Sequence, residues 1–153
     1  MKKVYPSVFQ NTSLSHSIIF TQSAFRDIAP LYCSPFWPKV FDIVVTLDSY
    51  SLPMGWHVKE FRYGFADGPV ESHVYQESER IADWAHSEWK SGSTVLIRCQ
   101  AGLNRSGLIT SLILLKEGLS LAQILELIRS KRGEYALSNK HFVEYLTKKV
   151  GKP

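Results

Sequence analysis

The 153-residue sequence contains only two cysteines, Cys33 and Cys99. This number is too small for a disulfide framework, and the spacing of the two cysteines matches no common metal site, so we predict neither. Both thiols suit a reducing compartment. Cys33 follows the apolar residues Leu31 and Tyr32. We therefore interpret Cys33 as a packing residue rather than as a redox partner of Cys99.

The sequence also lacks a long apolar run. Its longest uncharged apolar stretch, near residues 108–115, is too short to cross a bilayer, because a spanning helix needs about 20 apolar residues. Lys2 and Lys3 resemble the basic start of a signal peptide, but the polar run from Gln10 to Ser17 interrupts any apolar core after them. We therefore expect a cytoplasmic protein that does not associate with membranes.

No internal repeat, low-complexity tract or linker divides the chain. With 44% hydrophobic and 21% charged residues, the composition predicts one soluble globular domain over residues 1–153. The net charge of +4 favours anionic ligands such as phosphate esters, phosphorylated proteins or nucleic acid ends. Basic residues near the C-terminus are interpreted as solvated, so no dedicated nucleic-acid patch is expected. They are Arg129, Lys131, Arg132, Lys140, Lys148 and Lys149.

The segment 98–107 carries the strongest chemical signal in the chain. It follows an apolar, β-branched run at 94–97 that is typical of a buried strand, and it precedes an apolar run that is typical of a buried helix. At such a turn the backbone N–H groups of residues 100–105 can point into one concavity, and the helix N-terminus adds partial positive charge. The turn is therefore predicted to bind a phosphoryl group and to stabilise a thiolate at Cys99.

Each position of the turn has a chemical interpretation. Cys99 is the expected nucleophile, and the planar guanidinium of Arg105 can hold two phosphoryl oxygens. Gly102 suits a position that needs a positive φ or the close approach of a phosphate, and the Ser106 hydroxyl can help the sulfur to leave in a second step. The predicted substrate-binding residues are Gln100, Ala101, Gly102, Leu103, Asn104 and Arg105.

At these residues the chain resembles the cysteine-based protein tyrosine phosphatases, especially their compact dual-specificity branch, whose loop reads His-Cys-x-x-Gly-x-x-Arg-Ser/Thr. The resemblance implies a phosphatase that forms a cysteinyl-phosphate intermediate. It implies no cofactor, because the loop and Arg105 already neutralise the phosphoryl charge. Arg98 stands where the family usually has histidine. Arg98 either favours the thiolate or lies on the opposite face of the strand as a solvated charge.

The family supplies a general acid from a mobile loop upstream of the cysteine, and Asp67 fits that place. Asp67 lies before Gly68 and Pro69, between a predicted strand and a predicted helix. Asp48, at the end of another predicted strand, is the alternative acid, and Asp42 within that strand is a further competitor. Asn139 falls where related phosphatases often place an asparagine near the acid loop. A role as a plain helix N-cap is favoured for Asn139, so a serine there should serve nearly as well.

The predicted fold is α/β, a central mixed sheet flanked by helices, with the phosphate-binding loop between a strand and a helix as in the dual-specificity phosphatases. Strands are expected near residues 3–8, 18–21, 40–47, 58–63 and 94–98. Helices are expected at 72–91, 107–116, 121–131 and 140–149, with Ser120 and Asn139 as N-caps of the last two. The strand order cannot be derived from these patterns.

Three functions follow from these residues. The loop between Cys99 and Arg105 is uncharged, unlike the lysine-bearing loops of the inositol-lipid branch, so a phosphorylated protein or peptide is the expected partner. Phosphotyrosine and phosphoserine or phosphothreonine both stay open as substrates. Residues 102–107 also resemble the RNA 5′-triphosphatase loop Gly-x-Asn-Arg-Thr/Ser-Gly, which makes an RNA 5′ end the alternative substrate. Because Arg98 departs from the family pattern, a phosphate-binding pseudophosphatase is the third interpretation. The oligomeric state is not indicated.

Overall fold

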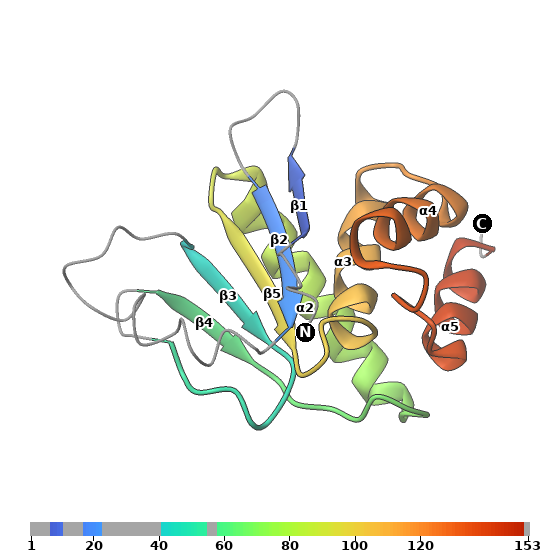
Figure 1. Cartoon of the computed structure of the whole chain (residues 1–153), viewed down its shortest axis with the longest axis horizontal. Coiled ribbons are helices and arrows are strands. Elements are labelled where there is room, and N and C mark those ends of the chain that lie inside the picture. The colour runs from blue at the N-terminus through green and yellow to red at the C-terminus, as the bar shows by residue number, and fades with distance from the viewer. Residues whose placement is uncertain (1–6, 11–16, 23–40, 55–57, 152–153) are drawn as a thin grey trace.

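The computed structural model describes residues 7–10, 17–22, 41–54 and 58–151, and Cys33 lies outside this part of the chain. Within it, five strands form one sheet in the order β1-β2-β5-β3-β4 (Figure 1). β1 is antiparallel to β2 and the other neighbours are parallel, so the sheet is mixed, as predicted. The strands are β1 (Ser7–Gln10), β2 (Ser17–Gln22), β3 (Ile43–Thr46), β4 (Lys59–Arg62) and β5 (Val95–Cys99).

Four helices are described, and their positions confirm the predicted ones to within two residues at each end. They are α2 (Ser72–Lys90), α3 (Arg105–Lys116), α4 (Leu121–Arg132) and α5 (Lys140–Val150). Ser120 caps α4 by accepting the N–H of Gln123, and Asn139 caps α5 by accepting the N–H of His141. None of the described helices is long and apolar enough to cross a membrane.

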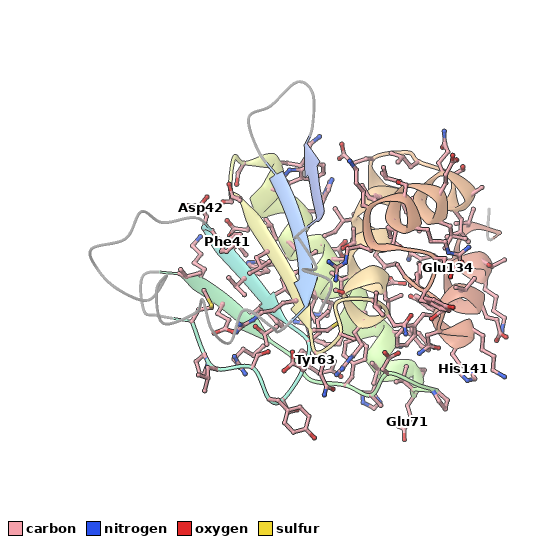
Figure 2. All side chains as sticks on the ribbon, in the orientation of Figure 1. Phe41, Asp42, Tyr63, Glu71, Glu134 and His141 are labelled. Carbon is pink, nitrogen blue, oxygen red and sulfur yellow. The ribbon has the colours of Figure 1, made fainter. Side chains whose placement is uncertain are left out.

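β5 lies at the centre of the sheet, between β2 and β3. Every residue of β3 and β5 is buried, as expected for parallel strands that are covered on both faces. Parallel neighbours bring their carboxyl ends to one edge of the sheet, where α/β proteins bind ligands. Figure 2 shows this direction, with Phe41 and Asp42 near the amino end of β3 and Tyr63 near the opposite edge. Cys99 thus emerges in the middle of the carboxyl edge.

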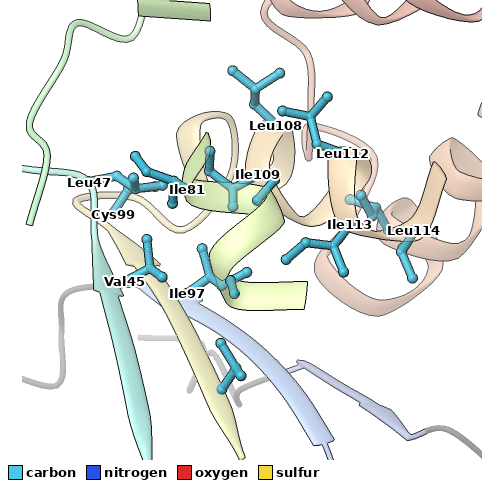
Figure 3. Packing of buried hydrophobic residues seen from close by; sticks show 14 of the residues in the cluster. Val45, Leu47, Ile81, Ile97, Cys99, Leu108, Ile109, Leu112, Ile113 and Leu114 are labelled. Carbon is cyan, nitrogen blue, oxygen red and sulfur yellow. The ribbon is translucent and has the colours of Figure 1, made fainter. Parts of the chain in front are cut away.

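The two faces of the central strands have different neighbours. Val45 and Ile97 face α2 and α3 and join the main hydrophobic core, as Figure 3 shows. Val44 and Leu96 alternate with them and pack on the other face with Phe41. Because side chains alternate along a strand, Cys99 belongs to the helix-covered face and Arg98 to the second face.

Arg98 is buried on this second face, at 2% exposure. Its Nε donates to Thr46 Oγ1 at 2.9 Å. Its Nη2 donates to the Leu52 carbonyl at 2.6 Å and to Glu60 Oε1 at 3.1 Å. The interpretation of Arg98 as a charge on the opposite face of the strand was thus correct about the face but wrong about solvation. The guanidinium is paired with a carboxylate inside the protein.

Glu60 is the acceptor at the centre of this network. Its Oε1 also accepts from Thr46 Oγ1 at 2.6 Å and Arg62 Nη1 at 2.7 Å, while its Oε2 accepts the Met54 N–H at 2.8 Å. Burial acts to raise the pKa of Glu60, but the hydrogen bonds from Thr46 and Met54 and the charges of Arg62 and Arg98 outweigh it and lower the pKa. The network therefore stabilises the segment that connects β3 to β4 as well as the strands β3, β4 and β5.

The first half of that connection, residues 47–54, carries two exposed apolar side chains on this anchored backbone. Tyr50 is 67% exposed and Leu52 is 58% exposed. The carbonyl of Leu52 is nevertheless bound by Arg98, and the carbonyl of Ser51 is bound by Arg62 Nη2 at 2.6 Å. The side chains are solvated while their backbone is fixed.

Glu60→Ala is expected to lower the free energy of unfolding by about 3–5 kcal/mol, because it leaves Arg98 as a buried charge without its carboxylate. Glu77 offers a control, since it pairs with the exposed Arg80 one turn away on α2. Glu77→Ala should cost less than about 1 kcal/mol. Urea unfolding measures the loss in free energy of unfolding for each variant. Equal losses in Glu60→Ala and Glu77→Ala would contradict a stabilising role for the buried pair of Glu60 and Arg98.

The lowered pKa of Glu60 also predicts how stability depends on pH. The carboxyl titrates near 4.5 when unfolded and below 4.5 when folded, so its contribution is complete above about pH 4.5 and is lost as the pH falls through the folded pKa. We expect Glu60→Gln to be less stable than the native protein at neutral pH, with a difference that shrinks below about pH 4.5. Urea unfolding over this range is the measurement. A difference in stability that stays constant across this pH range would show that the ionised Glu60 carboxylate is not its source.

Candidate active site

Residues 100–104 form the turn that joins β5 to α3, and we call it the phosphate turn after the ligand that the sequence predicts for it. β5 ends at Cys99 and α3 begins at Arg105, and both elements are buried. Gly102 has a φ of +65°, a left-handed conformation that glycine adopts without steric cost. The turn thus has the predicted strand-to-helix placement, and its glycine supplies the expected positive φ.

The carbonyl groups of this turn are held on its outer side. The Gly102 carbonyl accepts from Arg132 Nε at 3.2 Å and Nη2 at 3.0 Å, and the Leu103 carbonyl accepts the Leu137 N–H at 3.2 Å. In a trans peptide the C=O and N–H bonds point in opposite directions. The N–H groups of Leu103 and Asn104 therefore face away from α4 and Leu137, toward the inside of the turn. This is the orientation that an oxyanion site needs.

The connection between α4 and α5 packs closely against α3. A Cβ atom at Gly107 would lie 3.3 Å from Leu137 Cδ1, so a side chain there would press Leu137 outward. Leu137 itself has a φ of +53°, which is strained for a residue other than glycine. The hydrogen bond from its N–H to the Leu103 carbonyl and its full burial stabilise this conformation. The same hydrogen bond keeps Leu137 in contact with the phosphate turn.

Cys99 lies at the base of the turn and is only 1% exposed. Its Sγ is 3.3 Å from Ser106 Oγ, in the first turn of α3. Among the described residues, α3 has no side-chain cap hydrogen bond at its N-terminus, where the helix carries a partial positive charge. The sulfur is therefore close to one hydroxyl and to the first turn of α3.

Arg105 reaches across the sheet edge from the same helix turn. Its Nη1 donates to the Leu47 carbonyl at 3.1 Å and to the Phe65 carbonyl at 2.9 Å. These two contacts fix the guanidinium between the end of β3 and the segment that contains Asp67. Its Nε is buried and has no hydrogen-bond partner among the described residues. A buried donor without a partner is rare, and here it is available to an oxyanion.

Asp67 is exposed and is bound to the turn through both of its oxygens. Oδ2 accepts from Asn104 Nδ2 at 3.1 Å, and Oδ1 accepts from Asn139 Nδ2 at 2.9 Å. Asn139 Oδ1 accepts the His141 N–H at 3.0 Å, so the predicted cap is present. The expectation that serine would serve nearly as well is incomplete, because a serine could cap α5 without reaching Asp67.

Asp48, the alternative acid, has a different environment. It is 2% exposed, and its carboxylate accepts the N–H groups of Tyr50 and Ser51 and the Ser51 hydroxyl, at 2.9, 2.7 and 2.9 Å. Burial acts to raise the pKa of Asp48, but these hydrogen bonds and the charge of Arg105 outweigh it and lower the pKa below 3.8. A carboxyl that stays ionised is a poor proton donor at neutral pH.

Asp42, the further competitor, lies near the amino end of the sheet, away from the turn (Figure 2). Its Oδ2 accepts the Thr94 N–H at 2.8 Å. Of these three carboxylates, Asp67 is the one that contacts the phosphate turn. In the part of the chain that the structure describes, no group of three or more His, Cys, Asp or Glu residues could hold a metal ion.

Arg132 belongs to the site although its charge was interpreted as solvated. The guanidinium is partly buried and binds the Gly102 carbonyl. Burial lowers the pKa of Arg132, and the nearby Cys99 acts to raise it. Nothing in the sequence pattern distinguishes Arg132 from Lys131 or Arg129, because cations are favoured in the last turn of any helix.

Comparison with known proteins identifies the fold. No protein-family model matches the sequence, and no curated protein matches it significantly. Human DUSP28 superposes with a TM-score of 0.74 at 20% identity, over 94% of this chain and 92% of that chain. Tk-PTP in its active form superposes with a TM-score of 0.72 at 23% identity, over 100% of both chains.

A third solved structure, the human tyrosine phosphatase-like serine/threonine/tyrosine-interacting protein, superposes with a TM-score of 0.69 at 14% identity, over 87% of this chain and 90% of that chain. The likenesses extend over most of each chain. The protein therefore has the compact α/β fold of the dual-specificity phosphatases. The fold that the loop resemblance implied is confirmed.

Arg132→Met is expected to weaken binding of a tetrahedral oxyanion such as tungstate. Hydrogen bonds from a charged donor contribute about 1.5–3 kcal/mol, and without them the Gly102 peptide is free to turn its neighbouring N–H groups away. The expected loss in affinity is about 10- to 100-fold, measured by calorimetry. Lys148→Met removes the same charge from the exposed face of α5 and should have little effect. Equal weakening in both variants would show that only net charge matters.

Proposed function

We propose that this protein is a cysteine-dependent phosphatase that hydrolyses phosphotyrosine, and phosphoserine or phosphothreonine, in proteins or peptides. The observation that carries the proposal is the meeting of three reactive groups at one turn. Cys99 lies beside Ser106, Arg105 keeps a buried donor, and Asp67 is bound to Asn104 of the same turn. The phosphatases with the same fold support this function.

The first chemical step transfers the phosphoryl group to sulfur. The N–H groups of the turn and Arg105 Nε donate to the phosphoryl oxygens. The Cys99 thiolate attacks phosphorus, so an S–P bond forms while the bond from phosphorus to the leaving oxygen breaks. The protonated Asp67 carboxyl gives its proton to that oxygen. The products are the cysteinyl-phosphate, the alcohol or phenol, and the Asp67 carboxylate.

The second step returns the enzyme to its starting state. A water molecule attacks phosphorus and the S–P bond breaks, while the Asp67 carboxylate takes a proton from the water. The sulfur leaves as a thiolate, and the Ser106 hydroxyl 3.3 Å away donates a hydrogen bond to it. Inorganic phosphate is released, and both Cys99 and Asp67 recover their original protonation states.

Charge stabilisation in this site comes from fixed groups. Arg105 is held by two backbone carbonyls, and the Gly102 peptide is held by Arg132. Donors that are fixed before substrate binds are suited to stabilise the charge on the equatorial oxygens of the phosphoryl group in the transition state. The residues between Cys99 and Arg105 are uncharged. The turn is therefore suited to a single phosphoryl group on a protein side chain.

The alternative functions find less support. The resemblance to RNA 5′-triphosphatases rests on residues 102–107, and within this segment the Asn104 side chain is engaged with Asp67 and with the start of α5. The pseudophosphatase interpretation rested on Arg98 and on the open choice among the acid candidates. The Arg98 side chain lies on the face of β5 opposite to Cys99 and pairs with Glu60. The contacts of Asn104 and Arg98 therefore take no group that turnover needs away from the site.

Turnover of aryl phosphates in the presence of EDTA tests the proposal. We expect the native protein to hydrolyse para-nitrophenyl phosphate and phenyl phosphate, and Cys99→Ser to hydrolyse neither, because an alcohol at this position is a far weaker nucleophile. Asp67→Asn should lower kcat/KM for phenyl phosphate about 100- to 10,000-fold. It should affect para-nitrophenyl phosphate less, since that leaving group needs less protonation.

Asp83→Asn is the matched control for Asp67. Asp83 is an exposed carboxylate on α2 that pairs with Lys116, and its amide variant should leave both activities unchanged. A native protein that binds tungstate but hydrolyses neither ester would favour the pseudophosphatase. Faster phosphate release from triphosphate-ended RNA than from phosphopeptides would favour the RNA substrate.

A further inference from the structure

Asn104 occupies the N-cap position of α3 but does not cap it. Asparagine at this position ordinarily accepts an N–H of its own helix. Here Asn104 Oδ1 accepts the N–H groups of Ser138 at 2.8 Å and Asn139 at 3.0 Å, at the start of α5. Its Nδ2 donates to Asp67 Oδ2 at 3.1 Å. One side chain thus joins the phosphate turn, α5 and the Asp67 segment.

The hydrogen-bond network fixes which way the Asn104 amide points. A reversed amide would set its NH2 group against two backbone N–H donors and its oxygen against the Asp67 carboxylate. The same holds for Asn139, whose Oδ1 accepts the His141 N–H while its Nδ2 donates to Asp67. Each Asp67 oxygen therefore receives a proton donor from an amide whose own oxygen is anchored by backbone.

Asn104 and Arg105 are adjacent, and both hold the Asp67 segment. Arg105 Nη1 donates to the carbonyl of Phe65, two residues before Asp67. The residue that would bind the phosphoryl oxygens and the residue that fixes the carboxyl are thus consecutive in the turn. Any shift of the turn moves both groups together, so their relative positions are kept.

We propose that Asn104 is the positioning residue for the general acid. It binds Asp67 to the phosphate turn before substrate arrives, so that the carboxyl is already near the leaving oxygen. This inference rests on the proposed phosphatase function. The benefit is geometric, because a misplacement of a reacting group by about 1 Å can cost roughly 100-fold in rate. A second effect follows from the same contacts: Asn104 leaves the N-terminus of α3 uncapped and open to the phosphoryl group.

Asn104→Asp isolates the contact with Asp67. The variant has the same shape, and one carboxylate oxygen can still accept the N–H groups of Ser138 and Asn139. Only the Nδ2 donor is replaced, by an oxygen that repels Asp67. We expect kcat/KM for phenyl phosphate to fall about 10- to 100-fold more than kcat/KM for para-nitrophenyl phosphate. The ratio of the two values cancels any effect of the added charge on phosphate binding, which is common to both substrates.

Two further variants keep the test decisive. Asn104→Ser adds no charge and removes the donor to Asp67, so it should change the ratio in the same direction. Asn139→Asp keeps the α5 cap and removes the second donor, and it should also change the ratio in that direction. An unchanged ratio in Asn104→Asp and Asn104→Ser, with a native enzyme that hydrolyses both esters, would overturn the positioning role while leaving the proposed function intact.

Hydrogen exchange provides a readout that does not depend on activity. If Asn104 holds the Asp67 segment, amide exchange across residues 64–70 should be faster in Asn104→Ser than in the native protein, while exchange in α2 stays the same. Unchanged exchange across 64–70 would overturn the proposal. A native protein that hydrolyses neither ester would refute the phosphatase function. Exchange alone would then decide whether Asn104 holds this segment.

Discussion

The thiolate that the proposed chemistry requires at Cys99 is the constraint on which the rest of the site depends, because it places a negative charge inside the protein. Cys99 is almost fully buried, and a buried charge is stable only when donors and cations replace water. The Ser106 hydroxyl, the uncapped end of α3 and the guanidinium of Arg132 can supply this replacement. The central place of β5 follows from the same need, since an edge strand would bring the sulfur closer to solvent.

The alternation of side chains along β5 separates two charged systems that are neighbours in sequence. Arg98 and Cys99 are consecutive, yet Arg98 joins Glu60 and Thr46 on one face while Cys99 meets α3 on the other. The first system ties β3, β4 and β5 together, and the second performs the proposed chemistry. A cation can therefore stand beside the nucleophile in the sequence and still belong to the framework of the sheet.

Local patterns predicted the helices, four of the five strands and the turn from Cys99 to Arg105, because each depends on residues that are near one another in the chain. The first strand was predicted at 3–8, of which the structure describes only residues 7 and 8, and β1 is Ser7–Gln10. Local patterns could not predict contacts that depend on the strand order. Arg98 meets Glu60, 38 residues away, only because β3 lies between β5 and β4. Arg132 was missed because its contact with Gly102 depends on how α4 packs. Asn104 was predicted as a substrate-binding residue of the loop, but its contact with Asp67 depends on how α5 packs against the turn.

The exposed side chains of Tyr50 and Leu52 project from a backbone segment that is already held in place by hydrogen bonds. Asp48, Arg62 and Arg98 bind that backbone, so the segment is ordered before anything touches it. A partner that covered Tyr50 and Leu52 would restrict only their rotamers, at about 0.5–1.5 kcal/mol for each side chain, and would not have to freeze a loop. The fit of such a partner would therefore depend on these single side chains and not on the ordering of a loop.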